Sequence, residues 1–153
     1  MDIETLYDKL YRYCYMKTHH PQTAEDLTQE TFLRFLRTHG YEACGKNAAY
    51  LYTIARNLCV DHYRKSKTEL LEQTHEIPTE DSSERLSIRL VLEQAMESLP
   101  EEERELLFLR YTNEVPVGEI AEILGISRFA VRRREKRALD RLRKQLDRSD
   151  FYE

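Results

Sequence analysis

The sequence of 153 residues contains no tryptophan, only four glycines and four prolines, and no long hydrophobic segment. Because glycine and proline are scarce while 34% of the residues are charged, the composition favours a helix-rich protein. The longest apolar runs, such as residues 106–109, are far shorter than the roughly 18 residues that span a bilayer. The start, Met1-Asp2-Ile3-Glu4, lacks the basic and apolar regions of a signal peptide. We therefore expect a cytoplasmic protein without direct membrane insertion.

The three cysteines, Cys14, Cys44 and Cys59, are too few and too widely spaced for a disulfide framework or a zinc motif. Reduced thiols are the simplest interpretation. A metal site formed by His19, His20, Cys14 and Cys59 lacks the required ligand spacing. The sequence also lacks a P-loop, a nucleophile elbow and an HExxH motif. We expect no catalysis, no metal and no other cofactor.

Charge is distributed unevenly along the chain. Residues 1–67 carry a net charge of +2, residues 68–105 carry −9 and residues 106–153 carry +3, which together give the formal net charge of −4. Within residues 127–146, nine basic side chains accompany two acidic ones. A helix this basic could neutralise phosphates or bind an acidic partner. The overall acidic net charge argues against a protein that coats nucleic acid nonspecifically, so any contact with DNA should be confined to one part of the surface.

The acidic middle of the chain indicates a domain boundary. Residues 66–87 mix Ser, Thr, Glu and Pro78 with little apolar periodicity, which is typical of a solvated linker. We expect a flexible acidic linker over residues 67–86. On either side, residues 1–66 and 87–153 would form small domains with thin cores, which would gain stability from a partner.

The N-terminal block predicts three helices. Apolar residues recur every three or four positions from Ile3, and Pro21 should break that first helix. A second helix is predicted over residues 23–37 and a third over 47–65, with a glycine-bounded loop between them. The predicted buried stripes are Ala24, Leu27, Thr31 and Phe35 on the second helix, and Leu51, Ile54, Leu58 and His62 on the third.

The C-terminal block also reads as a series of helices. Asp81 or Ser83 can cap the first of them. Pro100, followed by three glutamates, suits the start of another helix, whose pattern stops near Asn113. Pro116 opens a short helix. Since no segment alternates with period two, the predicted fold is all-α, with two small helical domains.

The segment EIAEILGISRFAV, residues 119–131, carries the most specific local signal. A helix-turn-helix needs a small residue where the helices cross, a residue that tolerates positive φ in the turn, and an apolar anchor on the second helix. Ala121, Gly125 and Val131 meet these three requirements at the required spacing. Ser127 can cap the second helix, which continues to the end of the basic segment.

Projected at 100° per residue, the last helix gathers apolar residues on one side and basic residues on the other. In a recognition helix, the N-terminal residues reach base edges in the major groove and later cations contact phosphates. The alternative is an ordinary solvated basic face. The predicted DNA-reading residues are Ser127, Arg128, Phe129, Arg132, Arg133, Lys136 and Arg137.

Glu135 falls on the inward side of this helix, near Val131 and Leu139. A carboxylate in that place must be hydrogen-bonded, paired or close to the surface. We hypothesise that it pairs with Arg110 or Arg128.

Four ordered segments together resemble an extracytoplasmic-function (group IV) sigma factor of bacterial RNA polymerase. They are AEDLTQETFLRFL (24–36), YLYTIARNLCVDHYRK (50–65), LPEEERELLFLRY (99–111) and, after the helix-turn-helix, RALDRLRKQL (137–146). The resemblance covers nearly all of the chain. It implies a region-2-like domain over 1–66 that recognises and melts the promoter −10 element, and a region-4-like domain over 87–153 that reads the −35 element.

The resemblance also implies partners and residue roles. The partners would be the β′ clamp and β flap of core RNA polymerase, promoter DNA and an anti-sigma factor. The implied polymerase-binding residues are Asp26, Gln29, Glu30 and Leu33, which helical projection places opposite Leu27 and Phe35. The implied −10 residues are Tyr50, Tyr52, Arg56, Asn57, Tyr63, Arg64 and Lys65, although the tyrosines could instead pack in the core. The loop over residues 38–47 would capture a flipped base.

Four positions depart from the family's usual pattern. Phe129 stands where a small residue is common, Arg133 where a hydroxyl residue is common, Glu135 where the family has an apolar residue, and Tyr50 where it has Trp. The sequence therefore does not predict which promoter is read. The alternative function is a stand-alone helix-turn-helix regulator that binds duplex DNA as a dimer on paired half-sites.

Overall fold

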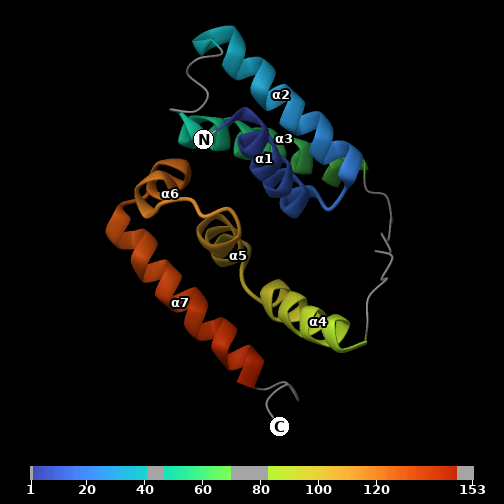
Figure 1. The fold of residues 1–153 in the computed structure, drawn as a ribbon, viewed down its shortest axis with the longest axis vertical. Helices are drawn as coiled ribbons and strands as arrows, with labels where there is room; N and C mark the ends of the chain where they lie inside the picture. Colours follow the sequence, from blue (N-terminus) through green and yellow to red (C-terminus); the bar gives the residue numbers. More distant parts are fainter. Residues whose placement is uncertain (1, 41–46, 70–82, 148–153) are drawn as a thin grey trace. The chain divides into compact units, whose positions relative to one another are not determined.

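The structure is a computed structural model that describes residues 2–40, 47–69 and 83–147. The described elements are α1 (Ile3–Thr18), α2 (Pro21–His39), α3 (Ala48–Glu69), α4 (Ser83–Glu97), α5 (Glu101–Leu107), the π-helical turn η2 (Phe108–Thr112), α6 (Val117–Leu124) and α7 (Arg128–Asp147) (Figure 1). No β-strand occurs in the described ranges, and the prediction of an all-α fold is confirmed.

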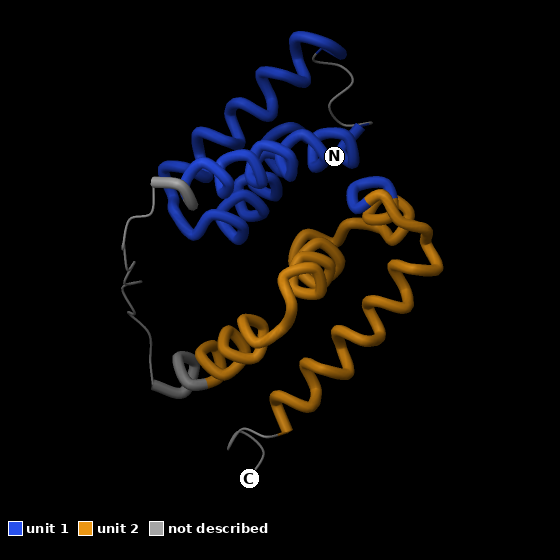
Figure 2. Tube along the Cα trace, turned by 180° about the vertical axis from the view of Figure 1, so that it is seen from behind, with its two compact units in different colours: residues 1–75, 122–124 blue, residues 76–121, 125–153 orange. Residues whose placement is uncertain are grey.

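The chain divides into two compact units (Figure 2). The first comprises residues 1–75 together with 122–124, and the second comprises residues 76–121 and 125–153. Helices α1, α2 and α3 all contact one another in the first unit and form a three-helix bundle. In the second unit, α7 packs against α4 and α5.

The core of the first unit receives side chains from all three helices. The largest fully buried ones are Leu6, Leu10, Tyr13, Phe35, Leu51 and Tyr52. Two buried threonines on α2 satisfy their hydroxyls locally, since Thr28 donates to the carbonyl of Ala24 and Thr31 to that of Leu27, each at 2.7 Å. Most of the predicted stripes are therefore confirmed, but Leu27, Ile54 and His62 are only half-buried.

The second helix begins two residues earlier than the sequence analysis expected. Helix α1 ends at Thr18, His19 adopts a left-handed conformation with φ of 57°, and Pro21 is the first residue of α2 rather than lying before it. Proline suits this position because its fixed φ is helical and its missing N–H would be unsatisfied there. His20 caps the helix, and its Nδ1 accepts a hydrogen bond of 3.2 Å from the backbone N–H of Thr23.

Helix extends into both ends of the predicted linker. Helix α3 continues to Glu69 and α4 begins at Ser83, whereas the linker was expected over 67–86. The lysines and glutamate after residue 64 favour helix and include neither Gly nor Pro, so nothing stops α3 at residue 66. Residues 70–82 lie outside the described residues, as do residues 41–46, which hold Cys44 and most of the expected base-capture loop.

The second unit is built around α7. Leu99, Leu107 and Ala138 form a buried cluster, against which Met96, Leu139 and Leu142 pack. Helix α5 passes into η2, where the N–H of Asn113 donates to the carbonyl of Phe108 at 3.0 Å, five residues back. The helical pattern thus stops at the predicted place, and the widened turn leads through Pro116 into α6.

Candidate nucleic-acid interface

The helix-turn-helix of α6 and α7 has the geometry that its sequence predicts. Ala121 is buried, and the anchor Val131 is fully buried. Gly125 ends α6 in the left-handed region with φ of 67°, and its N–H donates to the carbonyl of Ala121. All three predicted constraints are met, so the turn fixes how α7 leaves α6.

The start of α7 is capped by Ser127 as predicted, since its Oγ accepts a 3.0 Å hydrogen bond from the N–H of Ala130. Arg128 folds back onto α6, where a Cβ added to Gly118 would lie 2.9 Å from Nη2 of Arg128. The absent side chain of Gly118 therefore makes room for this guanidinium.

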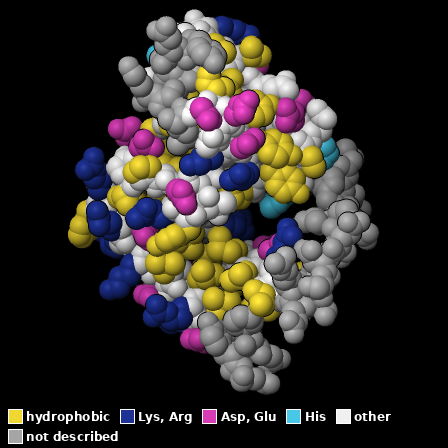
Figure 3. Space-filling view, viewed as in Figure 1, with side chains coloured by type: hydrophobic (Ala, Val, Ile, Leu, Met, Phe, Trp, Pro, Cys, Tyr) yellow, Lys and Arg dark blue, Asp and Glu magenta, His cyan; other side chains and the backbone are white. Residues whose placement is uncertain are grey.

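Every residue predicted to read DNA is exposed, at the cap of α7 or on the helix itself. These residues are Ser127, Arg128, Phe129, Arg132, Arg133, Lys136 and Arg137. The space-filling view shows Lys and Arg side chains gathered on the surface of the second unit along α7 (Figure 3). Phe129 is 72% exposed, and the guanidinium carbon of Arg133 lies 5.6 Å from the centroid of its ring. Cations on one exposed helix face suit contact with a phosphate backbone.

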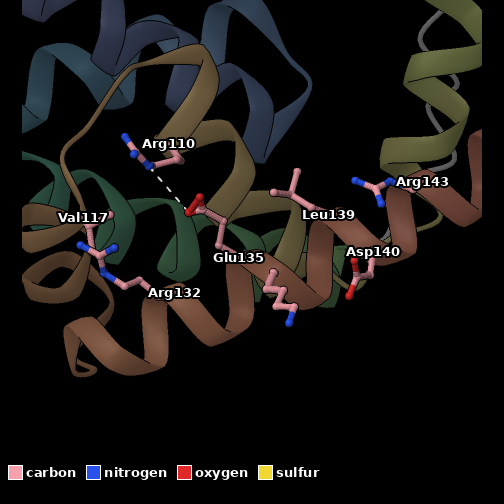
Figure 4. A pocket seen from close by; sticks show the side chains of 8 residues that line it. Arg110, Val117, Arg132, Glu135, Leu139, Asp140 and Arg143 are labelled. Atoms are coloured by element: carbon pink, nitrogen blue, oxygen red, sulfur yellow. Dashed lines mark ion pairs between the residues drawn. The ribbon is translucent and has the colours of Figure 1, made fainter.

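Glu135 is tied to the segment before α6. One of its carboxylate oxygens lies 3.7 Å from Nε of Arg110 (Figure 4), and the other accepts a 2.9 Å hydrogen bond from the hydroxyl of Tyr111. The hypothesised pairing with Arg110 is confirmed, whereas Arg128 points to Gly118 instead. The hydrogen bond to Glu135 raises the pKa of Tyr111.

A hollow of about 500 Å³ lies beside this ion pair on α7. It is lined by Arg110, Val117, Arg132, Glu135, Lys136, Leu139, Asp140 and Arg143 (Figure 4). Four cations and two carboxylates make it a polar surface depression, unlike the mostly apolar pockets that bind small molecules. The hollow belongs to the basic face of α7.

The predicted −10 residues divide between surface and core on α3. Tyr63 is 65% exposed and Tyr50 46% exposed, and Asn57, Arg64 and Lys65 are also exposed. One side of Tyr50 contacts the ring of His39 at 4.8 Å between centroids. An aromatic ring with this much exposed surface can support a stacked base.

Tyr52 requires a correction. Its side chain is only 1% exposed and meets Tyr13 edge to face, with ring centroids 5.6 Å apart. It is a core residue in the structure and cannot present its ring to a base without repacking the bundle. Arg56 is half-buried. The candidate surface on α3 therefore consists of the exposed residues alone.

The predicted polymerase-binding residues lie on the outer face of α2. Asp26 and Gln29 are exposed, and Leu33 is 49% exposed among them. Glu30 is partly exposed and forms an ion pair of 2.9 Å with Arg34. The structure therefore places all four side chains where a partner could reach them.

Two families of known proteins match this chain. Residues 3–69 match Sigma-70 region 2, and residues 95–144 match Sigma-70, region 4. The chain is 33% identical to the extracytoplasmic-function (ECF) sigma factor SigW of Bacillus subtilis, over 95% of this chain and 87% of that protein. It is 32% identical to SigM of the same organism, over 83% and 84% of the two chains, and 36% identical to BldN of Streptomyces coelicolor, over 91% of this chain and 56% of BldN.

The chain belongs to the ECF sigma factors. Its fold is also similar to that of the sigma factor RpoE in a co-crystal structure with the anti-sigma factor NepR from Bartonella quintana. The TM-score is 0.71 with 23% identity, over 94% of this chain and 93% of RpoE. The family resemblance seen in the sequence is confirmed, and a stand-alone regulator is not favoured.

In this sigma factor, ion pairs that the sequence did not predict join α5 to α7. Glu103 is buried and lies 3.3 Å from Nε of Arg141, while Glu102 lies 3.7 Å from Arg134. The glutamates after Pro100 were interpreted only as partners of the helix dipole. The signal that could have revealed these pairs was the complementary charge of residues 101–105 and 127–146.

No described helix of this sigma factor is long and apolar enough to cross a membrane. Within the same ranges, no group of three or more His, Cys, Asp or Glu side chains is arranged to hold a metal ion.

Proposed function

We propose that this ECF sigma factor directs core RNA polymerase to specific promoters in the cytoplasm, helps to melt their −10 region, and has no catalytic activity or cofactor of its own. The proposal keeps the division predicted from the sequence, with residues 1–66 acting at the −10 element and residues 87–153 at the −35 element. The observation that carries it is a helix-turn-helix with an exposed basic reading helix, in a chain that matches both Sigma-70 regions.

The −35 role rests on α7. Its capped N-terminus bears exposed Arg128 and Phe129, while Arg132, Arg133, Lys136 and Arg137 follow over two turns. This arrangement suits base contacts near the helix start and phosphate contacts further along.

The −10 role rests on the exposed part of α3. The open rings of Tyr50 and Tyr63 can stack on unpaired bases, and Arg64 and Lys65 can neutralise the single-stranded backbone. Asn57 offers both donor and acceptor atoms to a base edge. Stacking on these rings would offset part of the free energy that strand separation costs.

Docking to the β′ clamp is assigned to the outer face of α2. Leu33 supplies an exposed apolar centre among Asp26, Gln29 and Glu30. We expect Leu33→Asp to weaken binding of the full chain to the isolated β′ clamp coiled coil at least tenfold, because a charge would replace the apolar centre. Leu92→Asp is the matched control, since Leu92 on α4 is 44% exposed in the other unit. Equal losses in both variants would argue against this docking face.

An anti-sigma factor and the β flap are the remaining proposed partners. Helix α4 exposes Ile88, Leu90 and Leu92, each by more than two fifths. Ile88 and Leu92 are four positions apart and share one face of this helix, where an exposed apolar pair can contact a protein partner. A partner that covers it would remove that surface from water.

Transcription with purified components tests the function. Multi-round reactions would contain bacterial core polymerase, with or without the full chain, on a pooled promoter library of closed duplexes and templates pre-melted at the start region. Specific transcripts that require the protein are expected, and their aligned upstream sequences would define both promoter elements. Silence on every template, combined with tight duplex binding in the absence of polymerase, would contradict the proposal and favour a stand-alone regulator.

A further inference from the structure

Phe129 is the most exposed large apolar side chain in the part of the chain that the structure describes, at 72%. It is the second residue of α7, directly after the cap at Ser127 and Arg128. Its ring contributes nothing to the core, yet full burial of a phenylalanine is strongly favourable. The position at the start of a reading helix is one from which side chains reach base edges.

Arg133 is coupled to this ring. Its guanidinium carbon lies 5.6 Å from the ring centroid, within the range of a cation–π interaction, and the two residues are four positions apart on one helix face. The contact restricts the long arginine side chain before any DNA is bound. A guanidinium that is already ordered loses less rotamer entropy when it forms its hydrogen bonds.

Four other arginines of α7 lie against groups other than an exposed aromatic ring. Arg128 packs against Gly118, Arg134 lies near Glu102, and Arg141 pairs with the buried Glu103. Arg132 lines the hollow beside Glu135. Among the described arginines of α7, Arg133 alone lies over an exposed aromatic ring, which makes it the best candidate to read a base.

We propose that Phe129 and Arg133 act as one base-reading pair, in which Phe129 covers the 5-methyl group of a thymine and Arg133 donates two hydrogen bonds to O6 and N7 of a guanine. The inference rests on the proposed −35 function and specifies its substrate, a duplex with both bases close together. Thymine carries the apolar methyl group in the major groove, and guanine presents the acceptor pair that fits a guanidinium fork.

The spacing of the two residues limits the distance between the bases. Four residues of α-helix rise about 6 Å. Since base pairs stack about 3.4 Å apart, the thymine and the guanine lie within about two base pairs of each other.

The test uses the full chain bound to core polymerase. Wild type would first select transcribed promoters from a library randomised in the upstream element. In the selected promoter, deoxyuridine would then replace each thymine, which removes only the methyl group. In parallel, 7-deazaguanine would replace each guanine, which puts a C–H group in the place of N7 and removes that acceptor alone. Transcription would be measured at subsaturating holoenzyme for wild type, Phe129→Ala, Arg133→Ala and the control Arg134→Ala.

For wild type, we expect one deoxyuridine to lower transcription about three- to fivefold and one nearby 7-deazaguanine about tenfold. Phe129→Ala should lose the response to that deoxyuridine and weaken the response to 7-deazaguanine, because Arg133 loses its support. Arg133→Ala should lose the response to 7-deazaguanine, and Arg134→Ala should retain both. Thermal unfolding of the variants should match wild type, since the substituted side chains are exposed or only partly buried.

Two results would overturn the proposal while the sigma function stands. One is a wild-type holoenzyme that responds to no deoxyuridine, and the other is a Phe129→Ala variant with the wild-type pattern of responses. Absence of any promoter-specific transcription by wild type would instead contradict the proposed function itself, and the pair would then have no promoter to read.

Discussion

The hydroxyl of Tyr111 donates a hydrogen bond of 2.9 Å to the carboxylate of Glu135, across 24 positions of sequence. Arg110 approaches the other oxygen of the same carboxylate. The two adjacent residues of η2 thus hold α7 from one side, while Val131 anchors it in the core. Together these contacts fix the rotation of α7 about its own axis, and with it which side chains of α7 are exposed.

Loss of the Tyr111 hydroxyl should lower the free energy of unfolding by a small but measurable amount. We expect Tyr111→Phe to lower the free energy of unfolding by about 0.5 kcal/mol, at the low end for a hydrogen bond because Tyr111 is 54% exposed. Urea unfolding would measure it. In a double-mutant cycle with Glu135→Gln, the two effects should not add. Full additivity would show that the bond contributes no coupling.

The raised pKa of Tyr7 predicts how the free energy of unfolding changes at alkaline pH. Burial, followed by a hydrogen bond to Glu25, raises the pKa of Tyr7 to about 12. Because the raised pKa favours the neutral phenol in the folded state, this contribution is complete below about pH 10, the ordinary pKa of tyrosine, and is lost as the pH rises towards 12. Tyr7→Phe should therefore flatten the fall in stability between pH 10 and 12, as followed by urea unfolding at a series of pH values.

Glu25→Gln provides the companion variant for Tyr7. It removes the carboxylate partner, so it should reduce the same alkaline dependence without removing the stacking of Tyr7 on Phe32, whose ring centroids are 5.4 Å apart. The hydrogen bond from Tyr7 also lowers the pKa of Glu25. An alkaline profile identical to wild type in both variants would contradict the assignment.

The two glycines of the helix-turn-helix should respond oppositely to alanine. Gly125 has φ of 67°, where a Cβ is strained, so Gly125→Ala should cost about 1–2 kcal/mol of stability. Gly118 is helical, and only the end of the Arg128 side chain occupies the space of its Cβ. Because alanine favours helix and Arg128 can move, Gly118→Ala should leave stability unchanged or raise it by up to about 1 kcal/mol. Equal thermal shifts in the two variants would contradict this contrast.

Two tyrosines on α3 should separate folding from DNA opening. Tyr52→Ala removes a buried ring and should destabilise the first unit by about 3 kcal/mol or more. Tyr63→Ala removes an exposed ring, so stability should change by less than about 0.5 kcal/mol. We expect Tyr63→Ala to slow transcription from closed promoters more than from pre-melted ones. A similar slowing on both templates would argue against a role in melting.

Much of the second unit could be predicted because its constraints are local. Gly125, Ala121 and Val131 specify the helix-turn-helix within eleven positions, and each requirement concerns backbone geometry or close packing. Helical projection also predicted a partner for Glu135, Arg110 or Arg128, since a carboxylate on an inward face needs one, and the structure shows that it is Arg110.

The sequence did not predict features that depend on how helices pack against one another. Tyr50, Tyr52 and Tyr63 have the same chemistry, and only the position of α1 determines that Tyr52 meets Tyr13 while the other two stay exposed. The early start of α2 depended on His20 acting as a cap, a role that more often belongs to Asp, Asn, Ser or Thr. Glu103 was missed because its partner lies 38 positions later on another helix.

The ion pairs between α5 and α7 also bear on how promoter affinity depends on salt. Arg141 pairs with the buried Glu103, and Arg134 approaches Glu102, so a nearby carboxylate offsets part of the attraction of each arginine for phosphate. The slope of log affinity against log salt concentration counts only cations that displace counterions from the duplex, at about 0.9 per phosphate. That slope should therefore be shallower than the nine basic residues of positions 127–146 would suggest.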